Sequence, residues 1–528
     1  HMTILSYPKY LLLVVMIAII FIQCHQKKSR NENVTSGYNE QHRPQFHFSP
    51  PEKWMNDPNG MVYYNGVYHL FYQYYPDSTV WGPMHWGHAV SKDLVHWDHM
   101  PVALFPDSLG YIFSGSAIVD RNNTSGLGAN EQPPLVAIYT YHDPEGEKAG
   151  KNDYQVQGLA YSNDEGKTWN KHPSNPVLRN PGIKDFRDPK VFWYEVGKKW
   201  MMTLAVYDHI SLYSSPDLQT WTFESDFGKE HGSHAGVWEC PDLFPIKVQG
   251  DTITKWVLLL SINPGGPNGG SATQYFVGSF DGKRFVADSN TQTKWLDRGR
   301  DNYAGVTWSD MPTSDGRHIF LGWMSNWLYG MKVPTEKWRS AMTIPRELKL
   351  YRIEDDFYVH SIPVKELELL RTKEIKIDSQ TISGEIDLSS QIQFSPSQME
   401  GMIEFNRWDT MADFGIELSN ARGEKYRIGF NAATNEYYSD RTKSGKLDFS
   451  NEFGSKIVTA SRQSQAPSLK WHIFFDKTSV EFFADKGNVV FTEIFFPNED
   501  FTTVKLYSSN GSATLNQAEF YCLKSIWR

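Results

Sequence analysis

The stretch HAVSKDLVHW, residues 88–97, decides the fold, because the chain repeats its pattern three more times. In each copy an apolar strand leads into a serine and an aspartate-containing turn, and an aromatic residue follows about four residues after the aspartate. This order predicts a β-hairpin whose second strand begins at the aromatic residue. The other copies are LAYSNDEGKTW (159–169), LYSSPDLQTW (212–221) and FVGSFDGKRF (276–285).

The spacing of these hairpins predicts a β-propeller. The aromatic residues that end the four copies are 72, 52 and 64 residues apart, and no long stretch between them has helical periodicity. Hairpins that recur at such intervals are typical of radial blades, and a fifth blade is expected to contain RHIFLGWMSNW (317–327). A large β-sandwich with coincidental hairpins is the alternative. We therefore predict a five-bladed propeller over residues 45–345.

The rest of the chain predicts a second β domain. Residues 346–364 mix apolar and charged side chains and are expected to link two domains. Over residues 365–528, apolar and polar residues alternate between turn signals, as in KEIKID (373–378) and SVEFFADKGNVVFTEIFF (479–496), which is typical of a β-sandwich. The predicted fold class is all-β, a five-bladed β-propeller followed by a C-terminal β-sandwich.

The beginning of the chain resembles an export signal. Lys9 precedes an apolar run over residues 11–22, which is too short to span a bilayer but fits the core of a signal peptide. Cys24 follows this run and resembles the lipid-attachment cysteine of bacterial lipoproteins, with simple cleavage as the alternative. We predict a signal peptide over residues 1–24 and a polar tether over 25–44. The protein is then exported, either to the cell surface or outer membrane on a lipid anchor, or to the periplasm or medium.

Composition excludes several classes of partner. With 61 acidic and 52 basic residues, the net charge is −9, and no long basic block is present, which argues against nucleic-acid binding. The three cysteines cannot build a disulfide framework, and there is no Cys-x-x-Cys pair for zinc. His85, His88, His96 and His99 have no carboxylate or cysteine at ligand spacing, so packing is favoured over a zinc site. No metal and no cofactor are predicted.

Three acids stand in extended contexts that contain proline. Proline directly after Asp57 and Asp188 predicts extended backbone at both acids. Each acid could by itself belong to a turn or a surface ion pair, but each also precedes a predicted hairpin, so all three could lie on innermost strands near a propeller axis. Converging carboxyl groups are costly unless their pKa values are pushed apart, and acetal hydrolysis needs one ionised and one protonated carboxyl group. The acids lie in WMNDPNG (54–60, Asp57), FRDP (186–189, Asp188) and WECPD (238–242, Glu239).

These three blocks, in this order and at these separations, resemble the signature blocks of glycoside hydrolase family 32. That family comprises invertases, inulinases, levanases and related fructan hydrolases. The resemblance covers about residues 45–525. Further matching blocks are FYQY (71–74), WG (81–82), FSGSA (113–117), RDNYA (300–304), RSAMTIPR (339–346) and the stretch from VEFF (480–483) to FP (496–497).

The resemblance implies a propeller with a sandwich, a retaining mechanism and a role for each acid. Asp57 would be the nucleophile, Glu239 the acid and base, and Asp188 the stabiliser of the transition state. Arg187 would hold Asp188 in its ionised form, and nearby acids would raise the pKa of Glu239. Core packing is the alternative for the two tryptophans among the implied substrate-binding residues. Those residues are Asn56, Gln73, Trp81, Phe113, Ser114, Arg187, Tyr303 and Trp323.

The expected activity is therefore that of a retaining β-fructosidase. Its expected substrates are fructans, namely levan, inulin or fructo-oligosaccharides, together with sucrose. A surface lipoprotein that meets a polymer would favour levan and cleavage within the chain, although linkage and cleavage mode depend on loops around the pocket mouth. The alternatives are a fructosyltransferase, an inverting arabinan-type hydrolase and a non-catalytic fructan-binding protein, the last disfavoured because all three acids are present.

Overall fold

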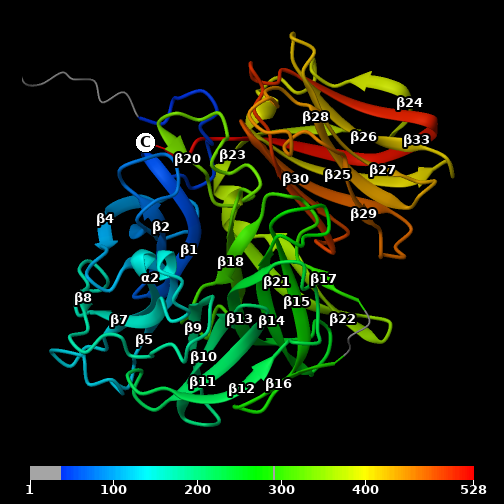
Figure 1. The fold of residues 1–528 in the computed structure, drawn as a ribbon. Coiled ribbons are helices and arrows are strands. Elements are labelled where there is room, and N and C mark those ends of the chain that lie inside the picture. Colours follow the sequence, from blue (N-terminus) through cyan, green and yellow to red (C-terminus); the bar gives the residue numbers. More distant parts are fainter. Residues whose placement is uncertain (1–36, 289–291, 528) are drawn as a thin grey trace, which may run out of the picture. The chain divides into compact units, whose positions relative to one another are not determined.

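The computed structural model describes residues 37–288 and 292–527. The predicted signal peptide, Cys24 and most of the predicted tether lie outside these residues. Within them the regular structure is almost entirely β-strand (Figure 1), and the predicted fold of a five-bladed β-propeller followed by a β-sandwich is confirmed. The described helices are α2 (Pro144–Lys148), η1 (Lys365–Leu370) and η2 (Pro396–Gln398), and none is long and apolar enough to cross a membrane.

Five antiparallel sheets form the blades of the propeller. The first strands of the blades contact one another in a closed ring, so residues on them converge on one axis. The first three blades contain β1 (Lys53–Tyr64), β2 (Val67–Tyr75), β3 (His85–Ser91) and β4 (Asp98–Leu104); β5 (Tyr111–Val119), β6 (Leu135–His142), β7 (Gln155–Ser162) and β8 (Asn170–Lys171); and β9 (Phe186–Tyr194), β10 (Lys199–Val206), β11 (His209–Ser215) and β12 (Thr222–Phe227).

Short additional strands extend blade four and blade one. In blade four, β17 (Lys294–Trp295) pairs with the third strand. In blade one, β20 (Trp338–Arg339), which lies between the second and third strands of blade five in the sequence, pairs in parallel with β1. The strands of the last two blades are β13 (Val237–Lys247), β14 (Thr254–Asn263), β15 (Ala272–Phe280) and β16 (Phe285–Ala287), and then β18 (Tyr303–Thr307), β19 (His318–Trp323), β21 (Arg346–Ile353) and β22 (Asp356–Pro363).

The four repeated segments are the outer hairpins of blades one to four. In blade three, Asp217 accepts hydrogen bonds from the backbone N–H groups of Gln219 (2.9 Å) and Thr220 (2.7 Å). Leu218, between Asp217 and Gln219, has φ 65°, the left-handed conformation that the turn needs. Asp93 accepts equivalent bonds in blade one. The aspartate is thus the residue that closes the turn, because its side chain replaces a backbone acceptor.

Two predicted boundaries are wrong. Residues 346–364 are not a linker, because they form β21 and β22, the outer strands of the fifth blade. Their mixture of apolar and charged residues is the alternation of a strand buried on one face. The predicted tether also ends too late, since Arg43 is fully buried, donates to the backbone oxygen of Pro50 (2.7 Å) and lies 3.7 Å above the Trp338 ring.

The C-terminal domain is one hydrogen-bonded sheet of eleven strands folded around a large apolar core. The 21-residue strand β33 pairs with β26 in its first half and with β25 in its second half, and so joins the two layers. The strands are β23 (Arg371–Ile377), β24 (Gln380–Asp387), β25 (Met399–Trp408), β26 (Asp413–Ser419), β27 (Lys425–Asn431), β28 (Glu436–Lys443), β29 (Val458–Ser461), β30 (Leu469–Asp476), β31 (Ser479–Ala484), β32 (Val489–Ile494) and β33 (Thr503–Leu523).

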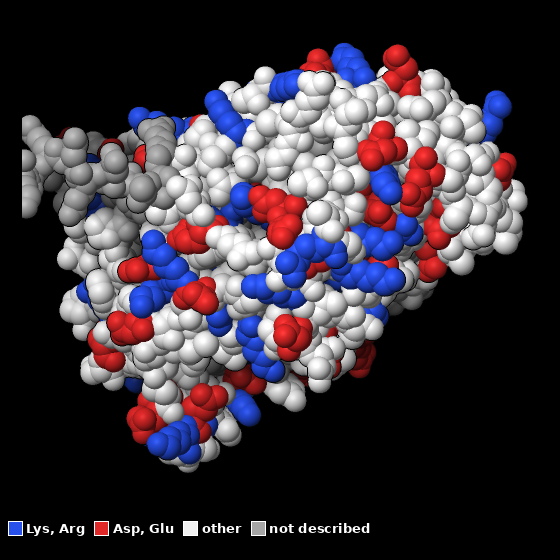
Figure 2. All heavy atoms as spheres, turned by 90° about the horizontal axis from the view of Figure 1, so that it is seen from above, with Lys and Arg blue, Asp and Glu red and all other residues white. Residues whose placement is uncertain are grey.

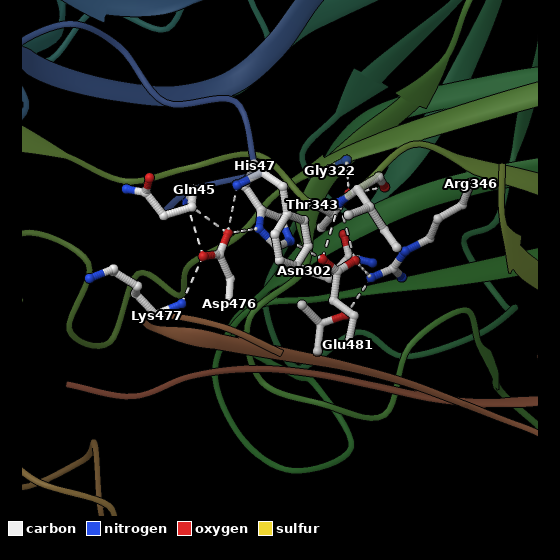
Figure 3. Close-up of polar contacts among 12 residues, drawn as sticks. Gln45, His47, Asn302, Gly322, Thr343, Arg346, Asp476, Lys477 and Glu481 are labelled. Atoms are coloured by element: carbon white, nitrogen blue, oxygen red, sulfur yellow. Dashed lines mark hydrogen bonds and ion pairs between the residues drawn. The ribbon is translucent and has the colours of Figure 1, made fainter. Parts of the chain in front are cut away.

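Buried charged groups connect the two domains (Figure 3). His47 lies between Asp476 and Glu481, two acids of the sandwich, and its Nδ1 is 2.8 Å from Asp476. Arg346 of β21 forms a second ion pair with Glu481 (2.6 Å) and a third with Asp297 (3.0 Å). These side chains are almost completely inaccessible to solvent. Each buried charge is compensated by an opposite charge, which is the condition for keeping it in the interior.

The exposed charges are mixed in sign. On the face drawn in Figure 2, acidic and basic side chains alternate across the surface rather than separating into two patches. This mixture agrees with the modest net charge of −9. The surface on that side therefore has no single-sign field that would steer a strongly charged polymer.

Candidate active site

Each innermost strand of a blade contains a β-bulge. The register is shifted on β1 between Met55 and Pro58, and corresponding shifts occur on β5, β9, β13 and β18. A bulge bends the strand and re-aims neighbouring side chains, and it is frequent next to active sites. The bulges therefore allow all five blades to direct polar groups toward the axis. The predicted site residues at or beside them are Asp57, Ser114, Asp188, Glu239 and Tyr303.

Proline lies in two of these bulges, as Pro189 and Pro241, and borders a third as Pro58. Proline cannot donate to the ladder, so within sheets it is confined to edges and bulges. The prediction that Pro189 keeps Asp188 extended is wrong, because Asp188 has φ 65°. Cys240, which precedes Pro241, also lies in the left-handed region, at φ 49°. Such backbone costs about 1–3 kcal/mol per residue and is retained where the surrounding structure fixes it.

Asp57 receives hydrogen bonds from three side chains. Ser114 Oγ donates to Oδ2 at 2.6 Å, Asn56 Nδ2 donates to Oδ1 at 3.0 Å, and Cys240 Sγ lies 3.5 Å from Oδ2. Burial, followed by the charge of Glu239, raises the pKa of Asp57, and these three donors oppose that rise. The donors stabilise the ionised form of the carboxyl group, which is the form that a nucleophile needs.

Glu239 is fixed on both of its oxygens. Arg187 donates to Oε1 through Nη2 (2.9 Å) and Nε (3.2 Å), and the Tyr303 hydroxyl donates to Oε2. The other end of the guanidinium pairs with Asp185 (2.6 Å). Arg187 is expected to hold Asp188, but its hydrogen bonds go to Glu239, Asp185 and Gln155 (3.5 Å) instead. The reason is geometric, because the left-handed backbone at Asp188 turns its carboxyl group toward Cys240 rather than back along β9.

Asp188 receives a backbone hydrogen bond from Cys240 N–H at 3.0 Å, and the Cys240 thiol lies 3.5 Å from its Oδ2. Burial is the largest of the effects that raise the pKa of Asp188 to about 7, and the charges of Glu239 and Asp57 add to it. The charge of Arg187 lowers this pKa, in the expected direction, but burial and the two other acids outweigh it. Burial and the three acids also raise the pKa of Cys240 well above its usual range, so the thiol stays protonated and has one hydrogen to donate to either Asp57 or Asp188.

The three acids open into a cavity of about 330 Å³. On one wall Trp81 contacts Phe113 edge-on with ring centroids 6.0 Å apart, and His142 stacks on Phe113 at 4.2 Å. Gln73 donates to Asn59 and to the Ile112 carbonyl group, both at 2.9 Å. The lining residues are Asn56, Asp57, Gln73, Trp81, Phe113, His142, Glu147, Gln155, Asp185, Arg187, Asp188, Glu239, Trp327 and Met331.

Three predicted binding residues lie behind the cavity wall. Ser114 and Tyr303 reach the acids by hydrogen bonds, as described above. Trp323 is fully buried and packs on Trp54 (6.1 Å) and Trp327 (4.9 Å). The indole that reaches the cavity is that of Trp327, four residues further along GWMSNW. Trp323 is therefore a core residue, as the alternative of core packing predicts.

The sequence motifs that predict the site do not include several lining residues, above all His142 and Glu147. Glu147 lies on the short helix α2, and its Oε2 is 3.1 Å from Nε2 of His142. Gln155 Nε2 holds the other ring nitrogen of His142 at 3.1 Å. HDPEGEK (142–148) has the composition of an ordinary turn. Its Asp-Pro pair repeats the pattern of the NDP and RDP blocks, and this is the one feature that could have marked it.

A second cavity, of about 360 Å³, lies against the sandwich domain. Its walls include Ile362, Met402 and Phe483, and it lacks a convergent set of hydrogen-bonded acids such as the three on the propeller axis. Chemistry therefore identifies the axial cavity as the candidate active site, although it is the smaller one. Within residues 37–288 and 292–527, no group of three His, Cys, Asp or Glu side chains is arranged to hold a metal ion.

A five-bladed propeller with three carboxyl groups around one axial pocket defines the class of a glycoside hydrolase. Comparison with known proteins gives the family. Residues 47–361 match the N-terminal domain of glycosyl hydrolases family 32, and residues 366–522 match the C-terminal domain of that family. The chain belongs to glycoside hydrolase family 32 and is an enzyme of the β-fructofuranosidase, levanase and inulinase type.

The similarity to individual proteins extends over most of the chain. A levanase of Bacillus subtilis is 47% identical over 93% of this chain and 72% of its own length, and an extracellular exo-inulinase of Aspergillus niger is 37% identical over 93% and 96%. Among solved structures, an exo-inulinase from Aspergillus awamori has a TM-score of 0.85 at 34% identity, covering 93% of this chain and all of the other. A β-fructofuranosidase from Schwanniomyces occidentalis complexed with fructosyl-erythritol has a TM-score of 0.84 at 30% identity, covering 94% and 100%.

Proposed function

We propose that this chain is a retaining β-fructosidase that hydrolyses the fructosyl linkages of fructans. Asp57 is the nucleophile, Glu239 the acid and base, and Asp188 the stabiliser of the transition state. The observation that carries the proposal is that the three carboxyl groups, each on the innermost strand of a different blade, share one cavity of about 330 Å³. Their different hydrogen-bond partners give each group a different task.

In the first half of the reaction, the Asp57 carboxylate attacks C2 of the fructosyl unit while Glu239 gives its proton to the departing glycosidic oxygen. Asn56 and Ser114 hold the two oxygens of Asp57, so attack requires little reorganisation. Arg187 and Tyr303 hold Glu239 in one orientation. Asp188 accepts hydrogen bonds from hydroxyl groups of the fructose ring as positive charge develops on that ring.

In the second half, Glu239 is ionised and acts as a base. It takes a proton from water, whose oxygen attacks C2 and displaces the Asp57 carboxylate, so that the fructose leaves with its original configuration. Burial, followed by the charge of Glu239, raises the pKa of Tyr303 well above its usual range. Tyr303 therefore remains a hydrogen-bond donor to Glu239 in both halves of the reaction and does not compete for the proton.

The stereochemical course tests this mechanism. We expect the first fructose released to be the β-anomer, as followed by NMR before mutarotation, and Glu239→Gln to lower kcat by about 10²–10⁴-fold. Glu195→Gln is the matched control, because Glu195 is an exposed acid of blade three. Release of the α-anomer, or full activity of Glu239→Gln, would contradict the assignment.

For the substrate, we infer that levan is preferred and is cleaved at chain ends, which replaces the expectation of cleavage within the chain. The cavity of about 330 Å³ is at the lower end of the range of about 300–1,000 Å³ for small-ligand sites, which suits a terminal unit better than an internal segment. Levan is favoured by the 47% identity to a protein named levanase, against 37% to one named exo-inulinase. Chromatography of digests of levan, inulin and sucrose is the test. Fructose as the sole early product supports end-wise cleavage, and a ladder of oligomers excludes it.

We also propose that the protein is exported, since the A. niger relative is named extracellular and the first 24 residues resemble a signal peptide. Lipid attachment at Cys24 is the finer part of this proposal. Labelled fatty acid should enter the wild type and not Cys24→Ala, and equal labelling of the two would exclude an anchor at that residue.

A further inference from the structure

The wall of the active-site cavity includes a loop that does not belong to any blade sheet. This loop, residues 324–337, runs from β19 to β20 and carries Trp327 and Met331 to the cavity. Trp327 packs on Trp54 with ring centroids 5.8 Å apart, and its backbone N–H donates to Ser271 Oγ at 3.0 Å. These contacts with the propeller hold the part of the loop that lines the cavity.

The other side of the loop is held by the sandwich domain. Tyr329, two residues after Trp327, is not among the residues that line the cavity and is only 1% exposed. Its hydroxyl group donates to Asp301 and accepts a hydrogen bond from Nη2 of Arg441 at 2.8 Å. Its ring packs edge-on against Phe453, with centroids 5.0 Å apart. Arg441 and Phe453 both belong to the sandwich, on and after β28.

Arg441 uses its donors to join the two domains at this point. Nη1 bonds to Asp301 Oδ2 (2.6 Å) and to the Ile494 carbonyl oxygen (3.0 Å), and Nε bonds to the Phe453 carbonyl oxygen (2.9 Å). The side chain is 1% exposed. A buried guanidinium with four of its donors hydrogen-bonded is rigid, because each displacement would leave a donor without its partner.

From these contacts we infer that the sandwich positions the substrate wall of the active site, with Arg441 acting through Tyr329 on Trp327. The inference rests on the proposed function, because the wall matters only when a fructosyl unit fills the cavity. Arg441 and Tyr329 are positioning residues, since neither touches the cavity. The sandwich domain then contributes to substrate affinity, in addition to its contribution to the folded core.

The test separates affinity from turnover. Tyr329→Phe removes one hydroxyl group and keeps the ring, so it should raise KM for sucrose and short fructans about two- to tenfold and leave kcat nearly unchanged, because the acids do not move. Arg441→Met should raise KM at least as much. In a Trp327→Ala background, Tyr329→Phe should have no further effect on KM, because both changes act on the same wall.

Arg427→Met is the matched control, because Arg427 also belongs to the sandwich, pairs with Glu417 and lies over the Tyr507 ring. It should keep the KM of the wild type. If Tyr329→Phe and Arg441→Met only lower the melting temperature and leave KM unchanged in an active enzyme, the inference is overturned. If Tyr329→Phe raises KM equally with and without Trp327, action through that indole is overturned. A wild type that hydrolyses no fructoside would overturn the proposed function, and this inference with it.

Discussion

Ser114 decides how strongly Asp57 favours its ionised form. Burial and the charge of Glu239 raise the pKa of Asp57, and Ser114 makes the shortest of the three hydrogen bonds that oppose this rise, at 2.6 Å. Hydrogen bonds to a charged group contribute about 1.5–3 kcal/mol. A single hydroxyl group, held by the bulge on β5, thus helps to keep a nucleophile ionised among two other acids.

We therefore expect Ser114→Ala to raise the pKa of Asp57 and to shift the acid limb of the kcat/KM profile upward by about one pH unit. The loss of activity should be larger at pH 5 than at pH 8, because protonated Asp57 cannot attack. Ser116→Ala is the control, since Ser116 lies on the same strand and accepts a backbone hydrogen bond from Val191 (3.0 Å) away from the acids. A uniform loss at every pH would argue against this electrostatic role.

At the scale of the element, turns that are set by neighbouring residues could be predicted from the sequence. The position of a strand in a blade, or of a side chain relative to the cavity, could not. The Asp-capped hairpins of four blades are local, and the sequence pattern located them. The fifth blade lacks this pattern between β21 and β22, so its outer strands were interpreted as a linker. Trp323 and Trp327 have similar sequence contexts, and only the path of the loop after β19 decides which indole reaches the cavity.

The three acids were recognisable because proline marks their bulges, whereas the partner of Arg187 depends on the left-handed backbone at Asp188, which the preceding-proline rule does not foresee. Only the Asp-Pro pair between His142 and Glu147 resembles the other blocks, and both residues are brought to the cavity mainly by tertiary packing. They line the cavity because α2 folds back after β6, and a five-residue helix carries little amphipathic signal.

The repeat aspartate should act as a stability element without a catalytic role. We expect Asp217→Ala to lower the free energy of unfolding by about 1–2 kcal/mol, because the backbone N–H groups of Gln219 and Thr220 lose their acceptor. Urea denaturation measures the change, and kcat should stay that of the wild type. Asp208→Ala is the comparison, since Asp208 is an acid of the same blade whose side chain is 43% exposed. Equal stability of the two variants would show that the hydrogen bonds to Asp217 do not stabilise the fold.

At the scale of the whole molecule, the junction of propeller and sandwich is built from buried charges. His47 is bonded to Asp476 and Glu481, and both acids belong to the sandwich. Although burial lowers the pKa of His47, the hydrogen bonds and charges of the two acids outweigh it and raise the pKa to about 9. The charges of Arg346 and His47 and their hydrogen bonds lower the pKa of Glu481 against the effect of burial.

This coupling predicts a stability that depends on pH. The contribution of His47 is complete below its ordinary value of 6.5 and is lost as the pH rises toward about 9, an effect on the order of 3 kcal/mol. The contribution of Glu481 is present above its ordinary value of 4.5 and is lost on acidification. The melting temperature of the wild type should therefore fall between pH 6.5 and 9. In His47→Gln the melting temperature should be lower at pH 6 and nearly flat over that range, because the titrating group is gone. His172→Gln, on a surface turn of blade two, should keep the wild-type slope, and an equal slope in His47→Gln would show that the junction does not sense pH through His47.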